Sequence, residues 1–253
     1  MSKPLTKEDV IMHKKRAIKK LNNTLEKFIN DPTPKAGKHL KKANLISYWL
    51  ESYSTYLEWE ETFDPKRIIA YKRGDVIKVD FGFNIGSEHG GLHYAVVLDK
   101  YNKHNSPVVT VVPLSSGTKD SVYERDVFLG NELYRKMTYK HKVLMAAAKD
   151  KLDECSNLIE ALTNGDPDEN AELIKTIQAK QAEVINDLQL LEKYKNEIDR
   201  MKQGSVAMIE QITTVSKMRI HVPRESTDIL YGISFAAQEM ELINQKISEL
   251  YLN

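Results

Sequence analysis

Cysteine is nearly absent from this sequence: Cys155 is the single one among 253 residues. One cysteine excludes an intramolecular disulfide framework and a zinc site made of four cysteines. Long apolar runs are also missing, since none approaches the roughly 18 residues of a membrane helix, and the first residues have no apolar segment typical of a secretion signal. We therefore expect a cytoplasmic protein that does not enter a membrane.

The net charge is also small, at +1, but the charged residues are unevenly distributed along the chain. Residues 1–73 contain 16 Lys or Arg against 9 Asp or Glu, whereas the rest of the chain is slightly acidic. An excess of positive charge favours a polyanionic partner. A solvated helix face explains the same lysines equally well, so the sequence leaves both interpretations open.

The first 70 residues predict two helices. Residues 6–30 place apolar side chains at helical spacing, with Thr6 as N-cap and Asp9 three residues later. Pro32 and Pro34 end this helix, because proline lacks an amide donor and disfavours helix in the preceding residue. A second helix is expected over residues 37–62, and we expect its aromatic side chains to be buried.

Short strands follow from residue 71. Residues 75–83, 93–99 and 107–114 are apolar runs separated by turn residues, and Ser115, Ser116 and Gly117 are expected to end the third. Several short strands at close spacing predict a small twisted barrel. A further strand is expected over residues 205–212, and a closing helix over residues 227–252.

Residues 133–202 predict an antiparallel helical hairpin. Apolar or small side chains recur at spacings of three and four in two runs, which is the pattern of a coiled-coil seam. Breaker residues at 163–170 separate the two runs. The predicted seam consists of Leu144, Ala148, Leu152, Cys155, Ile159 and Leu162, and of Leu173, Ile177, Val184, Leu188, Leu191, Lys195 and Ile198.

These patterns predict three regions. Residues 1–70 form an N-terminal helical region, residues 71–131 and 204–253 form one β-rich domain, and residues 132–203 form a hairpin inserted into it. The ends of an antiparallel hairpin lie close together, so a single domain can accept one as a loop insertion.

Three motifs of the β-rich region resemble the MazF/PemK family of toxin ribonucleases. They are RGDV at 73–76, GSEHGGLH at 86–93 and AVVL at 95–98, and the register continues through VPLS at 112–115. After the hairpin, IEQI at 209–212 is similar to the LEQIRT segment of the family. The resemblance implies an α+β fold, in which a small SH3-like β-barrel carries appended helices, and it implies a homodimer.

The same resemblance implies a metal-independent endoribonuclease that needs no cofactor. Its substrate is single-stranded RNA, its products have 2′,3′-cyclic phosphate and 5′-hydroxyl ends, and its protein partner is an antitoxin. In this reaction the 2′-hydroxyl loses a proton, the 5′-oxygen gains one, and the phosphorane oxygens need hydrogen-bond donors.

Two positions depart from the family pattern. His93 occupies the position of the family arginine that contacts the scissile phosphate, and Thr213 that of the arginine in the later segment. Ser115 matches a family threonine and keeps its hydroxyl. We therefore predict His93 and Ser115 as the catalytic residues. His93 is open to three interpretations: a general acid or base, a binding residue in a site that no longer cleaves, or a packed strand residue. Ser115 is also explained as a turn residue.

The glycine-rich turn at 86–91 is predicted to border the substrate groove, since glycine lets backbone amides approach a phosphate closely. Glu210 is expected to support either the site or the hydrogen bonds of the barrel. No spacing places three metal ligands on one element, so no metal site is predicted. The predicted substrate-binding residues are Ser87, Glu88, His89, Gly90, Gly91, Ser116, Glu210 and Thr213.

The two missing arginines also support the hypothesis that the protein is a binding module and not an enzyme. It would then be a catalytically inactive member of this family. Such a module would bind nucleic acid through the basic N-terminal helix or a protein through the hairpin. The added helices are expected either to restrict access to the groove or to supply the dimer contact, and a partner-binding arm explains the hairpin equally well.

Overall fold

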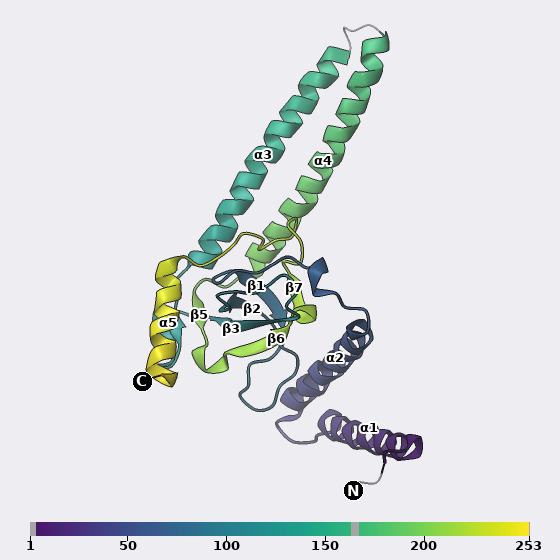
Figure 1. Ribbon diagram of the computed structural model, residues 1–253, viewed down its shortest axis with the longest axis vertical. Helices are drawn as coiled ribbons and strands as arrows, with labels where there is room; N and C mark the ends of the chain where they lie inside the picture. Colours follow the sequence, from purple (N-terminus) through teal and green to yellow (C-terminus); the bar gives the residue numbers. More distant parts are fainter. Residues whose placement is uncertain (1–3, 163–166, 253) are drawn as a thin grey trace. The chain divides into compact units, whose positions relative to one another are not determined.

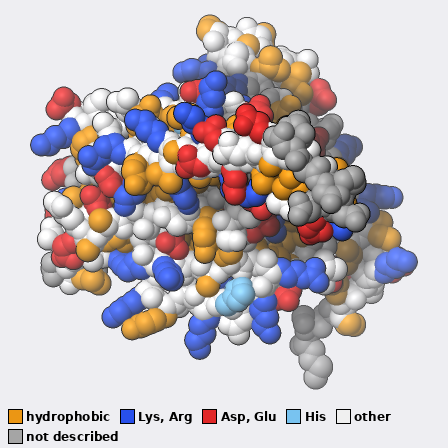
Figure 2. Space-filling model, turned by 90° about the horizontal axis from the view of Figure 1, so that it is seen from above, with side chains coloured by type: hydrophobic (Ala, Val, Ile, Leu, Met, Phe, Trp, Pro, Cys, Tyr) orange, Lys and Arg blue, Asp and Glu red, His pale blue; other side chains and the backbone are white. Residues whose placement is uncertain are grey.

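The computed structural model describes residues 4–162 and 167–252. The chain divides into two compact units, Met1–Thr62 and Phe63–Asn253 (Figure 1). The α+β class is confirmed, because the described residues form five α-helices and a seven-stranded antiparallel sheet. None of the described helices is long and apolar enough to cross a membrane. Figure 2 shows acidic and basic side chains interspersed on the face that it presents.

The first unit consists of α1 (Lys7–Ile29) and α2 (Ala36–Glu60). Thr6 caps α1 as predicted: its hydroxyl accepts a hydrogen bond from the Asp9 amide at 3.2 Å, and the Asp9 carboxylate accepts one from the Thr6 amide at 3.3 Å. The expected burial of the α2 aromatic residues is wrong, because Ala43 alone is buried among the residues of these two helices. A pair of helices buries little more than the stripe along which they touch.

The sheet of the second unit is built around its longest strand, β3. The strands follow the order β4-β5-β3-β2-β1-β7, and β6 also pairs with β3. Because this order is not closed, the SH3-like barrel that the resemblance implies is not confirmed. The strands are β1 (Val76–Asp80), β2 (Leu92–Val97), β3 (Val108–Ser116), β4 (Val127–Phe128), β5 (Ser205–Ala207), β6 (Thr213–Ser216) and β7 (Ile220–Val222).

The strands supply two separate apolar cores. Val76 and Val96 belong to a core shared with α3 and α5, whereas the neighbouring Ile77 and Val97 belong to a second core that includes Tyr71. Successive side chains of a strand point to opposite faces of the sheet. Both faces are therefore covered, which explains why the predicted strands are almost continuously apolar.

Two strand predictions need correction. β3 does not end before Ser115, because Ser115 and Ser116 pair with Val206 and Ser205 of β5. Ser115 is therefore a strand residue and not a turn residue. The strand expected over 205–212 stops at Ala207 and is followed by a short 3-10 helix, Ile209–Gln211, which turns the chain into β6.

The closing helix, α5, runs over Ala237–Tyr251 and not from residue 227. Leu230 has a φ of 70°, a left-handed conformation that a right-handed helix does not accommodate. Leu230 and Ile233 are still buried, as expected of apolar residues at this spacing, but they enter the core from an irregular segment.

The predicted hairpin is formed by α3 (Glu132–Leu162) and α4 (Pro167–Arg200), which pack along each other (Figure 1). Part of the breaker segment 163–170 lies outside the described residues, and from Pro167 onward it is helical. Proline is tolerated at the start of a helix because the first amides have no intrahelical partner.

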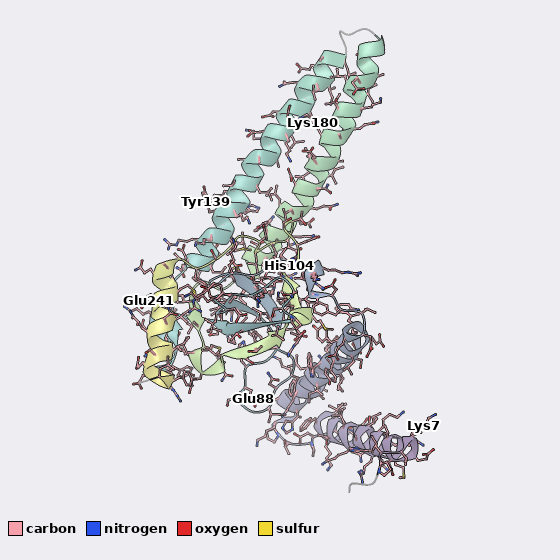
Figure 3. All side chains as sticks on the ribbon, in the orientation of Figure 1. Lys7, Glu88, His104, Tyr139, Lys180 and Glu241 are labelled. Carbon is pink, nitrogen blue, oxygen red and sulfur yellow. The ribbon has the colours of Figure 1, made fainter. Side chains whose placement is uncertain are left out.

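The seam of the hairpin is more polar than predicted. Lys151 lies 2.8 Å from Asp187, and Lys180, labelled in Figure 3, lies 2.7 Å from Glu154, so ion pairs join the two helices. The predicted seam is correct at four buried positions, Ala148, Cys155, Ile177 and Val184, and wrong at four exposed ones, Leu152, Ile159, Leu188 and Lys195.

Candidate functional site

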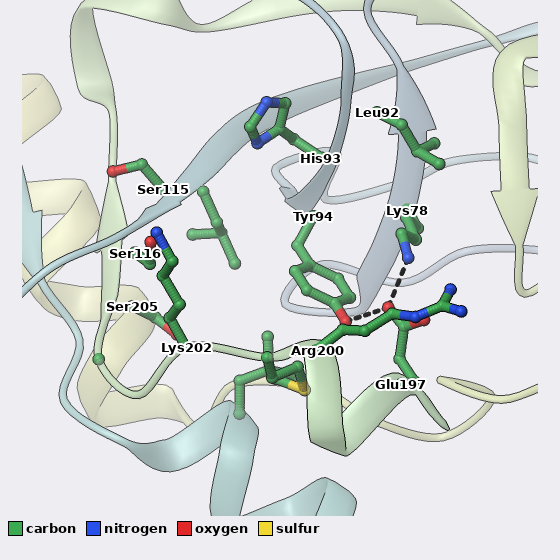
Figure 4. A pocket seen from close by; sticks show the side chains of 14 residues that line it. Lys78, Leu92, His93, Tyr94, Ser115, Ser116, Glu197, Arg200, Lys202 and Ser205 are labelled. Atoms are coloured by element: carbon green, nitrogen blue, oxygen red, sulfur yellow. Dashed lines mark hydrogen bonds and ion pairs between the residues drawn. The ribbon is translucent and has the colours of Figure 1, made fainter. Parts of the chain in front are cut away.

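A cavity of about 280 Å³ opens where β3 leaves β2 and begins to pair with β5, beside the last turn of α4 (Figure 4). Its lining brings together both predicted catalytic residues, His93 and Ser115. Ser116, a predicted binding residue, lines the same cavity. Residues that lie far apart in the sequence thus share one space.

The strand order brings His93 and Ser115 to the same cavity. Ala95 of β2 pairs with Pro113 of β3, and His93 and Ser115 each lie two residues beyond this last pair, where β3 turns from β2 to β5. Both side chains lie on the same face, because side chains alternate along a strand. Figure 4 shows the imidazole and the hydroxyl on one side of the cavity, away from the Glu197 carboxylate.

A buried carboxylate organises the opposite side of the cavity. Lys78 and Tyr94 are paired across β1 and β2. Glu197 of α4 accepts hydrogen bonds from the ammonium of Lys78 and from the hydroxyl of Tyr94, as the dashed lines in Figure 4 show. Burial, and then the Glu197 carboxylate, raise the pKa of Tyr94 above its ordinary value. These contacts connect the end of the hairpin directly to the sheet.

Two histidine rings contact each other at the edge of this cavity, with their planes tilted by 57°. The ring centroids of His89 and His93 are 4.3 Å apart. Burial, with a smaller contribution from His93, lowers the pKa of His89 to about 4. Burial also lowers the pKa of His93 below 6.5, an effect that the nearby Lys78 charge strengthens and a hydrogen bond with the Gly90 carbonyl opposes. Both imidazoles are therefore neutral near pH 7, the form in which a ring nitrogen accepts a proton.

A second cavity, of about 340 Å³, contains half of the predicted binding residues, Glu88, His89, Glu210 and Thr213. His89 lines this cavity and His93 lines the first, so the imidazole pair connects the linings of the two cavities. The Glu210 carboxylate forms an ion pair with Arg125.

Ser87, Gly90 and Gly91 are not among the residues that line either cavity. The amides of their turn are largely engaged, since the Gly91 N–H donates to the Gly82 carbonyl at 2.7 Å and the His89 N–H donates to the Gln211 side chain at 3.0 Å. A Cβ atom at Gly90 would stand 2.7 Å from the Gly82 oxygen, so glycine here permits close packing of the turn.

Four charged residues of the first cavity were not predicted from the sequence: Lys78, Glu197, Arg200 and Lys202. One available signal was the position of Arg200 and Lys202, which come just before the chain re-enters the sheet and must therefore lie near it. No group of three His, Cys, Asp or Glu side chains that could hold a metal ion occurs within residues 4–162 and 167–252.

Comparison with known proteins gives one finding. Residues 72–180 match the model of a family described as the PemK-like, MazF-like toxin of type II toxin-antitoxin systems. The matched residues include β1 to β4, α3 and the first part of α4, but not the segment from β5 to α5. No curated protein matches the chain. The resemblance seen in the motifs between residues 73 and 115 is thus confirmed, since residues 72–180 match the PemK-like, MazF-like toxin family, whereas the IEQI segment at 209–212 lies outside the match.

Proposed function

We propose that this protein is a metal-independent endoribonuclease that cleaves single-stranded RNA, leaving 2′,3′-cyclic phosphate and 5′-hydroxyl ends. The family match supports the reaction class. The observation that supports the assignment to a site is the cavity that His93 and Ser115 both line.

Each side chain has a defined role in this proposal. The neutral imidazole of His93 accepts the proton of the 2′-hydroxyl as its oxygen attacks phosphorus. The hydroxyl of Ser115 donates a hydrogen bond to a non-bridging oxygen, where negative charge develops. The bond from phosphorus to the 5′-oxygen then breaks, and that oxygen takes a proton from water in the open cavity.

The proposed biological role is that of the toxin in a toxin–antitoxin pair. An antitoxin protein is then the partner that blocks the RNA groove. A homodimer and a cytoplasmic location complete the proposal, and both follow from the family alone.

A cleavage assay in EDTA tests the reaction. Mixed-sequence single-stranded RNA is incubated with the full chain, and the product ends are identified by mass spectrometry. Cyclic phosphates formed in EDTA support the proposal, whereas 5′-phosphate ends or a requirement for added metal contradict it. Salt-sensitive RNA binding without cleavage would instead support the catalytically inactive module.

Replacing Ser115 by alanine is expected to lower the rate of cleavage about a hundredfold, because the variant loses one hydrogen-bond donor to the charge that develops in the transition state. Ser115→Thr keeps the hydroxyl and is expected to retain most of the activity. Single-turnover kinetics at saturating RNA separate this loss from weaker binding. Equal rates for wild type and Ser115→Ala would remove Ser115 from the mechanism.

A further inference from the structure

The first cavity has an uncompensated positive charge at its hairpin side. Three cations line it, namely Lys78, Arg200 and Lys202. The charge of Lys78 is balanced by its ion pair with Glu197. Arg200 and Lys202 are exposed, and neither forms an ion pair with another residue in the described part of the chain. Since His93 is neutral near pH 7, these two residues supply the net charge of the cavity.

The chain holds both cations in place from two sides. Before them, Glu197 fastens the last turn of α4 to Lys78 and Tyr94. After them, Ser205 pairs with Ser116 of β3. The intervening Gly204 has a φ of 83°, and a Cβ atom there would stand 1.9 Å from the Gly117 carbonyl oxygen, so this connection packs tightly against the sheet.

Arg200 lines the cavity from α4, beside Glu197 (Figure 4). It follows Glu197 by three residues on α4, and residues three apart share one face of a helix. Glu197 points at the sheet, so Arg200 lies over the same edge of the cavity, as Figure 4 shows. Lys202 lines the cavity nearer to Ser116 and Ser205 (Figure 4).

We infer that Arg200 and Lys202 form a binding site for a backbone phosphate of single-stranded RNA, next to the phosphate that is cleaved. Guanidinium and ammonium groups are the side chains that bind phosphate oxygens most strongly. Arg200 lies beside Glu197, across the cavity from His93 and Ser115 (Figure 4), so we assign the cations to a flanking phosphate and not to the reacting one. The inference rests on the proposed function for the identity of the strand, and it gives the inserted hairpin a role in substrate binding.

The test measures binding separately from cleavage. The probe is a fluorescent single-stranded oligonucleotide with 2′-O-methyl groups, which has no free 2′-hydroxyl and therefore cannot be cleaved. Binding to the full chain is followed by fluorescence anisotropy at several salt concentrations. The variant is Arg200→Ala/Lys202→Ala, and the matched control is Lys193→Ala/Lys195→Ala, which removes two exposed cations of α4 that do not line the cavity.

The cavity variant is expected to bind the probe at least about tenfold more weakly than wild type does. The reason is that it loses hydrogen bonds to a charged group, the phosphate. Its slope of log affinity against log salt is expected to fall by about 0.7, the value for one phosphate contact on a single strand. The control pair is expected to bind like wild type. Circular dichroism establishes that both variants are folded.

The outcomes distinguish this site from the proposed reaction. An equal loss in both variant pairs, no loss in either, or a wild type that does not bind the probe overturns the phosphate site. If wild type binds the probe through Arg200 and Lys202 but cleaves no RNA, the site stands and the proposed reaction fails. If wild type cleaves RNA and the cavity variant binds normally, the reaction stands and the phosphate site fails.

Discussion

Replacing His93 by alanine is expected to lower the rate of RNA cleavage about a thousandfold while leaving the protein folded. General-base catalysis by a positioned side chain accounts for a factor of roughly 10² to 10⁴. His93 lines the same cavity as Ser115, and its burial favours the neutral, proton-accepting form of the imidazole. Single-turnover cleavage of RNA in EDTA measures the loss, and thermal unfolding establishes that the variant is folded.

The pH dependence of cleavage provides an independent readout for His93. A base works only when unprotonated, so the rate rises as the pH passes upward through the pKa of the base. Burial places that pKa below 6.5, so the acid limb of the kcat/KM profile is expected below pH 6.5. This limb should disappear in His93→Ala.

His104, an exposed residue labelled in Figure 3, offers the matched control. His104→Ala removes an imidazole that lines neither cavity and is expected to cleave RNA at the wild-type rate. Wild-type activity in His93→Ala would show that His93 packs in the strand without acting as the base. An intact acid limb in that variant would lead to the same conclusion.

Replacing Glu197 by alanine is expected to lower the free energy of unfolding by about 3 kcal/mol. Removing one partner of a buried ion pair costs about 3 to 5 kcal/mol, because the other charge stays buried without compensation. The side chains of Lys78 and Glu197 are 21% and 11% exposed, which places this pair at the lower end of that range. The Tyr94 hydroxyl also loses its acceptor. Urea unfolding measures the change.

Two further variants make the role of Glu197 testable. Glu192→Ala removes an exposed carboxylate of the same helix and is expected to change the stability by no more than about 0.5 kcal/mol. Lys78→Met in the Glu197→Ala background removes the unpaired charge and is expected to restore part of the stability. If Glu197→Ala were no less stable than Glu192→Ala, the ion pair would contribute nothing to joining the hairpin to the sheet.

The sequence by itself determined the elements that depend on neighbouring residues. The capping box of Thr6 and Asp9 forms within four residues, and the end of α1 before Pro32 follows from the chemistry of proline. The strands around Val76 and Val96 follow from a run of β-branched residues. The family motifs between residues 73 and 115 also pointed to His93 and Ser115, which lie on β2 and β3, two strands that pair with each other.

Only the tertiary structure decided the features that join distant parts of the chain. Heptad spacing could not tell Leu152, which is exposed, from Ala148, which is buried, because the exact face depends on how α4 packs against α3. Leu230 follows the helical spacing of the closing segment but has a left-handed backbone. The charged half of the cavity comes from Glu197 and Arg200, about a hundred residues beyond His93. Periodicity describes one element at a time, whereas a buried ion pair between α4 and the sheet exists only after both have packed.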